Sequence, residues 1–361
     1  MTATTERLRE IGQSPWLDNI TRTILEDGTL RRYRDEFGVT GLTSNPTIFD
    51  EAIRGSAAYD LPIRALAERG LSAEALFIEV ALEDLRRAAD EFRAVHAASG
   101  GVDGWVSMEV SPLLADDAAT TVAAARAIHA HADRPNLFVK IPGTPAGLRA
   151  IEDSIFAGIP VNVTLLFSRE QYLAAADACA RGIERRIAAG LAPRVDSVAS
   201  VFVSRWDRAV TGRLPVPLAR GLGIAIAQRC YRAYRELLAS ARWRALSAAG
   251  VPPQRLLWAS TGVKDPAEWP STYVEALAAP DTIDTMPEQT LRHFATAGRP
   301  GEAMRADGGD AEATIARYAA AGVDVDALAA QLQREGAASF VASWRDLLQR
   351  IAAKSAALAA R

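Results

Sequence analysis

Residues 137–165 read LFVKIPGTPAGLRAIEDSIFAGIPVNVTL, and this stretch decides the fold. Two short apolar runs rich in β-branched residues, Leu137–Ile141 and Pro160–Leu165, flank the segment Pro145–Ala157, whose apolar residues recur at the helical period. Parallel strands need a long crossover connection, usually a helix. The stretch therefore predicts a strand–helix–strand unit with two parallel neighbouring strands.

The same alternation continues in both directions along the chain. The other predicted strands are Trp16–Leu17, Val39–Thr43, Trp105–Val110, Ser197–Val203, Leu256–Ser260 and Thr282–Thr285. The other predicted helices between strands are Ala73–His96, Ala118–Ala132, Arg169–Ala189 and Leu218–Leu246. Eight strands alternating with helices indicate an α/β fold, a (β/α)8 TIM barrel with additional helices. The alternative is an open doubly wound sheet, whose usual GxGxxG and Walker A signatures are absent.

Two regions do not follow the simple repeat. Residues 50–104 form a long, mostly helical connection between the second and third strands, and residues 287–361 add Ala-rich helices after the last strand. Neither region is bounded by a low-complexity linker. We therefore expect a single domain over residues 1–361, with a helical insertion near 50–104 and C-terminal helices over 287–361. Within the latter, Gly298–Asp310 contains four glycines and mixed charges, which predicts a surface loop.

Composition argues against several classes of protein. The formal net charge of −3 gives no field that would favour nucleic acid or an anionic membrane. The sequence has no run of 18 apolar residues and so predicts no membrane span. The N-terminus lacks the layout of a signal peptide, so we expect a cytoplasmic protein. Cys179 and Cys230 lie in helical stretches and the four histidines are scattered, which fits a reducing compartment and predicts no metal site.

Lysine is scarce, and its scarcity points to one residue. Of 41 basic residues only three are lysine, namely Lys140, Lys264 and Lys354. Arginine stays protonated in proteins, whereas a buried lysine can lose its proton and attack a carbonyl carbon. Lys354 in the Ala-rich C-terminal helix is interpreted as a chance retention. Lys140 ends an apolar strand, where an unpaired ammonium would be costly, so it is a candidate nucleophile.

The alternative for Lys140 is a structural ion pair in the core with Glu109 or Asp18. Active sites of such barrels lie at the C-terminal ends of the strands, where these two carboxylates also occur. Aldol chemistry needs groups that give and take protons, and two carboxylates in different environments can divide that work. Asp18 has a second interpretation, as the N-cap of a helix that starts near Ile20.

Other polar residues at the strand ends suit a phosphorylated polyol. Asn45, Asn162 and Ser200 offer neutral hydrogen-bonding groups. Arg205 and Ser260 are candidate phosphate ligands, although a surface arginine is the alternative for Arg205 in a chain this rich in arginine. Thr43 and Thr164 are equally typical of ordinary strands.

Several motifs resemble those of the transaldolase family. They are WLDNI (16–20), GLTSNPTIF (41–49), VSMEVSP (106–112), VKIPGT (139–144), PVNVTLLFS (160–168), SVFVSRWD (200–207), LLWAST (256–261) and TIDTMPEQT (282–290). Their order and spacing match the family from about Pro15 to His293. The resemblance implies a barrel of the class I aldolase type and an enzyme of the non-oxidative pentose phosphate pathway that needs no cofactor. Its reaction would move a dihydroxyacetone unit from sedoheptulose 7-phosphate to glyceraldehyde 3-phosphate, giving erythrose 4-phosphate and fructose 6-phosphate.

The resemblance also implies a role for each matching residue. Lys140 would form the Schiff base, Asp18 would exchange a proton with the C4 hydroxyl, and Glu109 would work with a water that Thr164 helps to hold. Asn45 and Asn162 would bind the substrate hydroxyls, and Ser200 would bind the dihydroxyacetone part. Arg205 and Ser260 would bind the phosphate. The expected partners are sugar phosphates, with no nucleic acid or membrane. The oligomeric state, monomer or homodimer, stays open.

One departure concerns the phosphate site. Many family members have an arginine just after the serine that matches Ser260, but this chain has no arginine there and reads STGVK up to Lys264, as in the actinobacterial and plant branch. Lys264 either supplies the second charge or is a solvated loop lysine.

Two rival functions stay open at this stage. The similar fructose-6-phosphate aldolases have tyrosine at the position of Phe202 and glutamine at that of Glu109, so both residues favour transfer over simple aldol cleavage. A non-catalytic barrel is the third possibility.

Overall fold

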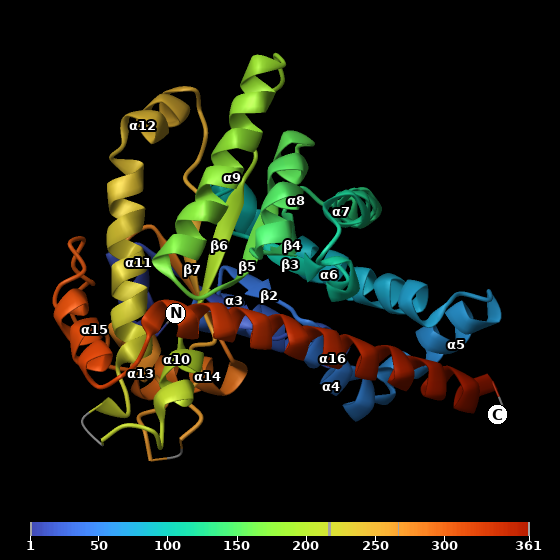
Figure 1. Ribbon diagram of the computed structural model, residues 1–361. Coiled ribbons are helices and arrows are strands. Elements are labelled where there is room, and N and C mark those ends of the chain that lie inside the picture. The colour runs from blue at the N-terminus through green and yellow to red at the C-terminus, as the bar shows by residue number, and fades with distance from the viewer. Residues whose placement is uncertain (1, 216–217, 266, 360–361) are drawn as a thin grey trace.

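The computed structural model describes residues 2–215, 218–265 and 267–359. Its eight strands are β1 (Gln13–Asp18), β2 (Gly41–Thr43), β3 (Val106–Glu109), β4 (Leu137–Pro142), β5 (Val161–Leu166), β6 (Ser197–Phe202), β7 (Arg255–Ala259) and β8 (Thr282–Met286). They form one parallel sheet in the order β2-β1-β8-β7-β6-β5-β4-β3. Backbone hydrogen bonds from Leu42 N to Trp105 O (2.9 Å) and from Gly104 N to Thr40 O (2.7 Å) join its two edges. The predicted (β/α)8 barrel is therefore confirmed (Figure 1).

Helices surround the barrel and extend from it. They are α1 (Ala3–Ile11), α2 (Arg22–Glu26), α3 (Thr29–Phe37), α4 (Pro46–Gly55), α5 (Asp60–Glu68), α6 (Ala73–Ala98), α7 (Ala118–Ala132), α8 (Pro145–Phe156), α9 (Arg169–Ala188), α10 (Ser204–Val210), α11 (Leu222–Leu238), α12 (Ala241–Ala248), α13 (Thr272–Ala276), α14 (Glu288–Ala297), α15 (Ala311–Ala320) and α16 (Val325–Ala359). Among the described residues none of them is long and apolar enough to cross a bilayer.

The single helix predicted over Leu218–Leu246 is wrong. The structure has α11 and α12 instead, and the break falls at Ser240, whose hydroxyl accepts a hydrogen bond from Trp243 N at 3.3 Å. Serine competes for backbone groups in this way, which is why it begins helices more often than it continues them. The apolar period runs through the break and could not reveal it.

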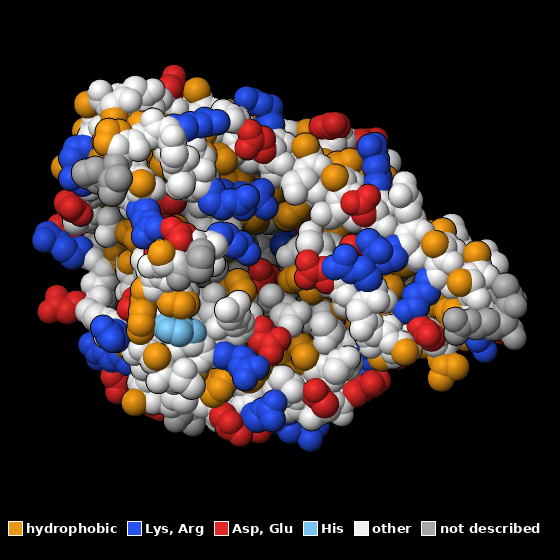
Figure 2. Space-filling view, turned by 90° about the horizontal axis from the view of Figure 1, so that it is seen from below, with side chains coloured by type: hydrophobic (Ala, Val, Ile, Leu, Met, Phe, Trp, Pro, Cys, Tyr) orange, Lys and Arg blue, Asp and Glu red, His pale blue; other side chains and the backbone are white. Residues whose placement is uncertain are grey.

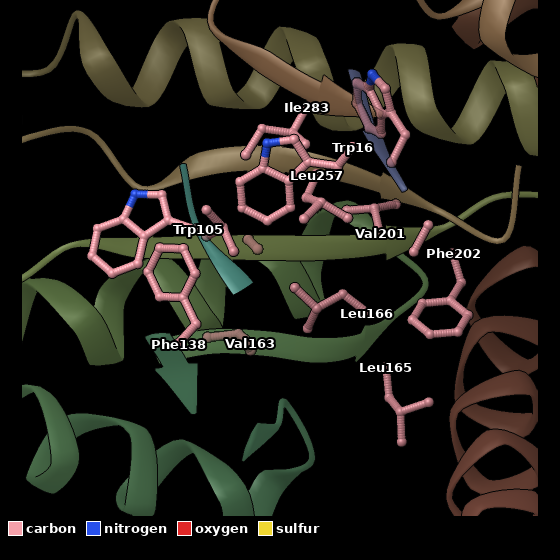
Figure 3. Close-up of a cluster of buried hydrophobic side chains, with 14 of the residues drawn as sticks. Trp16, Trp105, Phe138, Val163, Leu165, Leu166, Val201, Phe202, Leu257 and Ile283 are labelled. Carbon is pink, nitrogen blue, oxygen red and sulfur yellow. The ribbon is translucent and has the colours of Figure 1, made fainter. Parts of the chain in front are cut away.

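Large apolar side chains fill the barrel interior (Figure 3). Trp105 stacks on Phe138 with ring centroids 4.0 Å apart, and the ring centroids of Trp16 and Phe138 are 6.4 Å apart. Such filling is typical of these barrels, which are packed cores rather than pores. It leaves room for a ligand only beyond the packed layers.

At the N-terminal ends of the strands the barrel is sealed by Arg255, which is 8% exposed. Its guanidinium donates to Ser14 Oγ (2.6 Å), Thr282 O (2.7 Å) and Val102 O (3.1 Å), and Asp103 Oδ1 lies 3.4 Å away. The Asp103 carboxylate also accepts from Ser14 Oγ at 2.8 Å. A cavity of about 400 Å³ borders this cluster. The charges at this end of the barrel are thus paired within the protein.

The connection between β2 and β3 is mostly helical, as predicted, and consists of α4, α5, α6 and the short 3-10 turn at Ala57–Tyr59. A buried cluster ties it to the barrel. Arg22 of α2 donates to Asp84 Oδ1 of α6 at 2.9 Å, and Tyr59 Oη donates to Asp84 Oδ2 at 2.9 Å. Burial raises the pKa of Asp84 to about 6, against the lowering effect of Arg22.

Helix α16 runs across the C-terminal ends of the strands and on along α4 (Figure 1). Near its start Gln333 Nε2 donates to Gly143 O and Leu165 O, both at 3.0 Å. Near its end Lys354 Nζ donates to Ile53 O (3.0 Å) and Ser56 O (2.9 Å), carbonyls at the C-terminus of α4. Cations suit helix C-termini, so Lys354 has a structural task that the sequence did not reveal.

Candidate active site

A cavity of about 290 Å³ opens at the C-terminal ends of the strands, under α16. Figure 2 looks into this end of the molecule and shows a central hollow with basic side chains on its rim. The expected site residues that line the cavity are Asp18, Asn45, Lys140, Thr164, Ser200, Phe202, Arg205, Ser260 and Lys264. The fold therefore brings together residues from six strands and their following loops, as a barrel site requires.

Strand register explains why the central side chains meet. Lys140 on β4 is paired with Glu109 on β3 and with Asn162 on β5. Residues at the same register position on neighbouring strands point to the same face, here the barrel interior. Glu109 and Asn162 do not line the cavity themselves but lie directly beside residues that do.

Lys140 is 5% exposed and has few partners for its charge. Its Nζ donates to Ser44 O at 3.0 Å, and Glu109 Oε2 lies 3.7 Å away, beyond a normal hydrogen bond. This loose pairing supports neither a saturated structural ion pair nor an isolated charge. It leaves the amine able to turn toward a ligand in the cavity.

Glu109, at the end of β3, is buried. Burial raises the pKa of Glu109 to about 7, while the Lys140 ammonium opposes this effect and the Asp18 carboxylate adds to it. Its Oε2 accepts no hydrogen bond within the described residues. A carboxyl with a pKa close to ambient pH is suited to act as both acid and base.

Asp18 lies at the end of β1 and is not the cap of the following helix. Thr21 caps α2, because its hydroxyl accepts from Ile24 N at 3.1 Å, so the N-cap interpretation of Asp18 is wrong. Asp18 Oδ1 instead accepts from Thr43 Oγ1 at 2.8 Å. Burial raises the pKa of Asp18, and the Lys140 ammonium and the Thr43 hydroxyl oppose that shift.

The neutral side chains of the site form two hydrogen bonds in series and leave one hydroxyl without a partner. Ser200 Oγ donates to Asn162 Oδ1 at 2.7 Å, and Asn162 Nδ2 donates to Ser107 Oγ at 3.2 Å. Thr164 Oγ1 is buried and has no hydrogen-bond partner in the described part of the chain. An unpaired buried hydroxyl beside a cavity is a ready position for water or a ligand hydroxyl.

Asn45 has a structural task as well. Its Oδ1 accepts from Ile48 N at 3.1 Å and so caps α4. The carbonyl side of this amide is therefore occupied, and only its NH2 group is left to donate toward the cavity.

The outer part of the cavity carries three cations, from Arg205 and Arg208 of α10 and from Lys264. Among the described residues none of the three forms an ion pair with a carboxylate. Burial, and next the nearby Arg208 guanidinium, lower the pKa of Arg205. Glu335 opposes this lowering of the Arg205 pKa. Like charges gathered at a cavity without an ion-pair partner indicate an anion site.

Arg208 was not expected from the sequence. It was one of many arginines, but it follows Arg205 by three residues, and residues at this spacing share a helix face. Ser260 adds its hydroxyl, whose Oγ lies 2.9 Å from Ser204 Oγ. Ser260 has φ +58°, a left-handed conformation that costs energy in a residue with a side chain.

Two further residues come from α16 and were also missed. Ser339 and Phe340 line the cavity, and the Phe340 ring centroid lies 6.0 Å from Lys140 Nζ. The motifs that suggested the site end at residue 293, so no local signal pointed to them. Among the described residues no cluster of three or more His, Cys, Asp or Glu side chains is placed to share a metal ion.

The fold and the cavity together define a class: an α/β-barrel protein with an amine, two carboxyls of raised pKa and a group of cations at the C-terminal ends of its strands. The comparisons with known proteins agree. The profile of the transaldolase/fructose-6-phosphate aldolase family matches residues 15–351, so the chain belongs to this family.

Curated relatives extend the match to almost the whole chain. A transaldolase of Frankia alni is 45% identical, over 96% of this chain and 95% of the relative. A transaldolase of Thermobifida fusca is also 45% identical, with 98% of both chains covered. Outside the actinobacteria, a transaldolase of Neisseria gonorrhoeae is 41% identical over 94% of this chain and 97% of its own length.

Proposed function

We propose that this protein is a transaldolase that transfers a dihydroxyacetone unit from sedoheptulose 7-phosphate to glyceraldehyde 3-phosphate through a Schiff base on Lys140. The products would be erythrose 4-phosphate and fructose 6-phosphate, as in the non-oxidative pentose phosphate pathway. The observation that carries the proposal is the placement of a loosely paired lysine amine beside a carboxyl whose pKa is about 7, at the end of a closed barrel.

The first step joins the Lys140 amine to the ketone carbon of the donor sugar. The nitrogen lone pair forms the C–N bond, and the resulting carbinolamine loses its hydroxyl as water to give the imine. Glu109 supplies and recovers the protons, because its pKa lets it hold or release one near neutral pH. Thr164, whose hydroxyl has no partner in the described residues, supports the water that carries them.

The second step breaks the C3–C4 bond. Asp18 takes the proton of the C4 hydroxyl, the C4 oxygen becomes an aldehyde, and the bond electrons move into the protonated imine. The aldose phosphate then leaves, and a dihydroxyacetone unit stays on Lys140. The Thr43 hydroxyl at 2.8 Å orients the Asp18 carboxylate for this task. Addition to the acceptor aldose phosphate is the reverse of this step.

Binding follows the polarity of the cavity. Ser200 and Asn162 serve the dihydroxyacetone part and the neighbouring hydroxyls, and the free NH2 group of Asn45 donates to a hydroxyl. Arg205 and Ser260 bind the phosphate. The second cation that the sequence lacks after Ser260 is supplied by Arg208 together with Lys264.

A Schiff-base aldolase that releases free dihydroxyacetone is the rival. Against it, Phe202 occupies the position where similar aldolases have tyrosine, and no tyrosine hydroxyl lines the described cavity to protonate the intermediate. The test measures dihydroxyacetone released from fructose 6-phosphate with and without erythrose 4-phosphate. We expect slow release alone and rapid sedoheptulose 7-phosphate formation with the acceptor. Release as fast as transfer would favour the aldolase.

The setting of the enzyme completes the proposal. The chain acts as one domain, residues 1–361, whose C-terminal helices complete the site. It works in the cytoplasm on sugar phosphates, without a cofactor, metal, nucleic acid or membrane, as a monomer or homodimer. Its near-neutral net charge of −3 supports the absence of polyanionic partners.

A further inference from the structure

Helix α16 brings one aromatic side chain over the nucleophile. Phe340 is 7% exposed, lines the cavity, and places its ring centroid 6.0 Å from Lys140 Nζ. At that distance the ring lies over the amine at the outer limit of a cation–π contact. Together with Ser339 it forms the α16 side of the cavity, while the remaining lining residues come from the strand ends and the loops and helices that follow them.

The helix is fixed on both sides of Phe340. Seven residues before it, Gln333 donates to Gly143 O and Leu165 O at 3.0 Å. Three and four residues after it, Ser343 Oγ lies 2.9 Å from Thr47 Oγ1, and the Trp344 ring packs edge-on against Phe77 at 5.1 Å. These positions share one helix face, so the face that carries Phe340 is the anchored one.

Gly336, one turn before Phe340, lets this face come close to the strand ends. A Cβ at this position would lie 3.0 Å from Leu165 Cδ2 and 3.1 Å from Arg205 Nη1. Figure 3 shows Leu165 and Phe202 at the end of the interior cluster that faces a helix. The close approach fixes the height of the Phe340 ring above the cavity.

The covalent intermediate of the proposed reaction has one competing fate. The enamine left by C3–C4 cleavage first takes a proton at C3 and becomes the imine. Water then adds to the imine carbon with its oxygen forming the new C–O bond, the C–N bond breaks as the nitrogen takes a proton, and free dihydroxyacetone leaves. A dry site suppresses this hydrolysis, and an apolar ring over the nitrogen is a means to exclude water. The polar groups of the site that handle water, Glu109 and Thr164, lie on β3 and β5, whereas the ring descends from α16.

We propose that Phe340 is a specificity-determining residue that shields the Lys140-bound intermediate from water and thereby sets the ratio of transfer to hydrolysis. The inference rests on the proposed function, since it concerns the intermediate of that reaction. It assigns to α16 a task at the reacting atoms, beyond its packing against α4 and α6.

The experiment compares wild type with Phe340→Ala and Phe340→Leu. It measures free dihydroxyacetone released from fructose 6-phosphate without acceptor, divided by the rate of transfer to erythrose 4-phosphate. We expect the ratio to rise roughly tenfold in Phe340→Ala and less in Phe340→Leu, which keeps most of the apolar volume. Lys354→Gln is the control, because it loosens α16 at its far end without touching the cavity; its ratio should match wild type.

The outcomes separate the inference from the function beneath it. An unchanged ratio in folded Phe340→Ala, with transfer intact in wild type, overturns the shielding role alone. If Phe340→Ala does not fold, the folded Phe340→Leu variant decides by the same ratio. An equal rise in Lys354→Gln assigns the effect to loosening of the helix and also overturns the role of Phe340. A wild type that forms no covalent adduct with fructose 6-phosphate overturns both the inference and the proposed function.

Discussion

The two ends of the barrel use the same kinds of side chain in opposite ways. At the N-terminal end Arg255 and Asp103 share a network in which the guanidinium donates to one hydroxyl and two carbonyl oxygens besides the carboxylate. At the C-terminal end Lys140 makes one hydrogen bond, and its nearest carboxylate oxygen is 3.7 Å away. The first arrangement is complete within the protein, whereas the second leaves groups available to a ligand.

The difference teaches that unpaired charged groups, rather than cavity size, distinguish the end of the barrel that carries the proposed site. The cavity at the N-terminal end is the larger, about 400 Å³ against about 290 Å³. Yet Arg205, Arg208 and Lys264, three cations without an ion pair among the described residues, line the smaller cavity, and the unpartnered atoms of Glu109 and Thr164 lie at or beside it. Among the residues that line the larger cavity, the unpartnered side-chain atom is the oxygen of a neutral amide, Gln13 Oε1. Buried polar groups left unpaired in a folded protein are costly, and a catalytic role is a reason to keep them.

The largest effect is expected from Lys140→Arg. Arginine keeps the positive charge but cannot provide a neutral amine, so activity should fall by a factor of at least about 10³ while the fold is kept. A coupled transfer assay and circular dichroism measure the two properties. Lys354→Arg is the matched control, and it should retain wild-type activity. Appreciable transfer by the Lys140 variant would show that the loosely paired amine at the C-terminal end is not needed for the reaction.

At the opposite end Arg255→Met should change stability rather than chemistry. The variant leaves the Asp103 carboxylate without its cation, which is expected to lower the free energy of unfolding by about 3 kcal/mol. Urea denaturation gives this value, and kcat of the folded protein should stay within about twofold of wild type. Arg244→Met, at an exposed arginine of α12, serves as control. A fall in kcat without a loss of stability would show that Arg255, at the N-terminal end, serves catalysis rather than structure.

Arg208→Gln tests the anion site. We expect KM for phosphorylated donors to rise about tenfold, with kcat nearly unchanged, because one charge-assisted contact is lost. Competitive inhibition by inorganic phosphate should weaken to a similar extent, and cleavage of a non-phosphorylated ketose should not change. Arg213→Gln, an exposed arginine outside the cavity, is the control. Equal KM values for the two variants would exclude Arg208 from the phosphate site.

The sequence predicts the strands and their site residues but not all of the residues that helices bring to the cavity. All eight strands and the residues on them, such as Lys140 and Asn162, follow from short local patterns, and parallel register then sets their neighbours. Arg208 and Phe340 could not be found in this way. The task of Arg208 depends on its neighbours across the cavity, and that of Phe340 on how a helix far along the chain folds back over the strands. The break at Ser240 was missed because periodicity does not register a cap.

The smallest effect should come from Asp284, whose unpartnered oxygen does not line the functional cavity. Its Oδ1 accepts from Thr261 Oγ1 at 2.9 Å, and burial raises the pKa of Asp284 to about 7. The ordinary pKa of an aspartate, 3.8, applies to the unfolded state. Between pH 3.8 and about pH 7, the folded protein therefore keeps a proton on Asp284 that the unfolded protein has already lost. Stability from this proton is present at low pH and is lost as pH rises through that window.

Asp284→Asn should remove this pH dependence. At pH 8 the variant should be more stable than wild type by on the order of 1 kcal/mol, and at pH 5 the difference should shrink. Urea midpoints at both pH values measure it, with Asp116→Asn, at an exposed aspartate, as control. A large loss of kcat in Asp284→Asn would show that an unpaired group away from the cavity also serves the chemistry.

The most direct test of the account is the site of covalent attachment. Fructose 6-phosphate is added with sodium borohydride, which reduces an imine to a stable secondary amine, and the modified peptide is identified by mass spectrometry. The account predicts one dihydroxyacetone-derived adduct, on Lys140, and none in Lys140→Arg. An adduct on Lys264 or another residue, or no adduct in the wild-type protein, would contradict it.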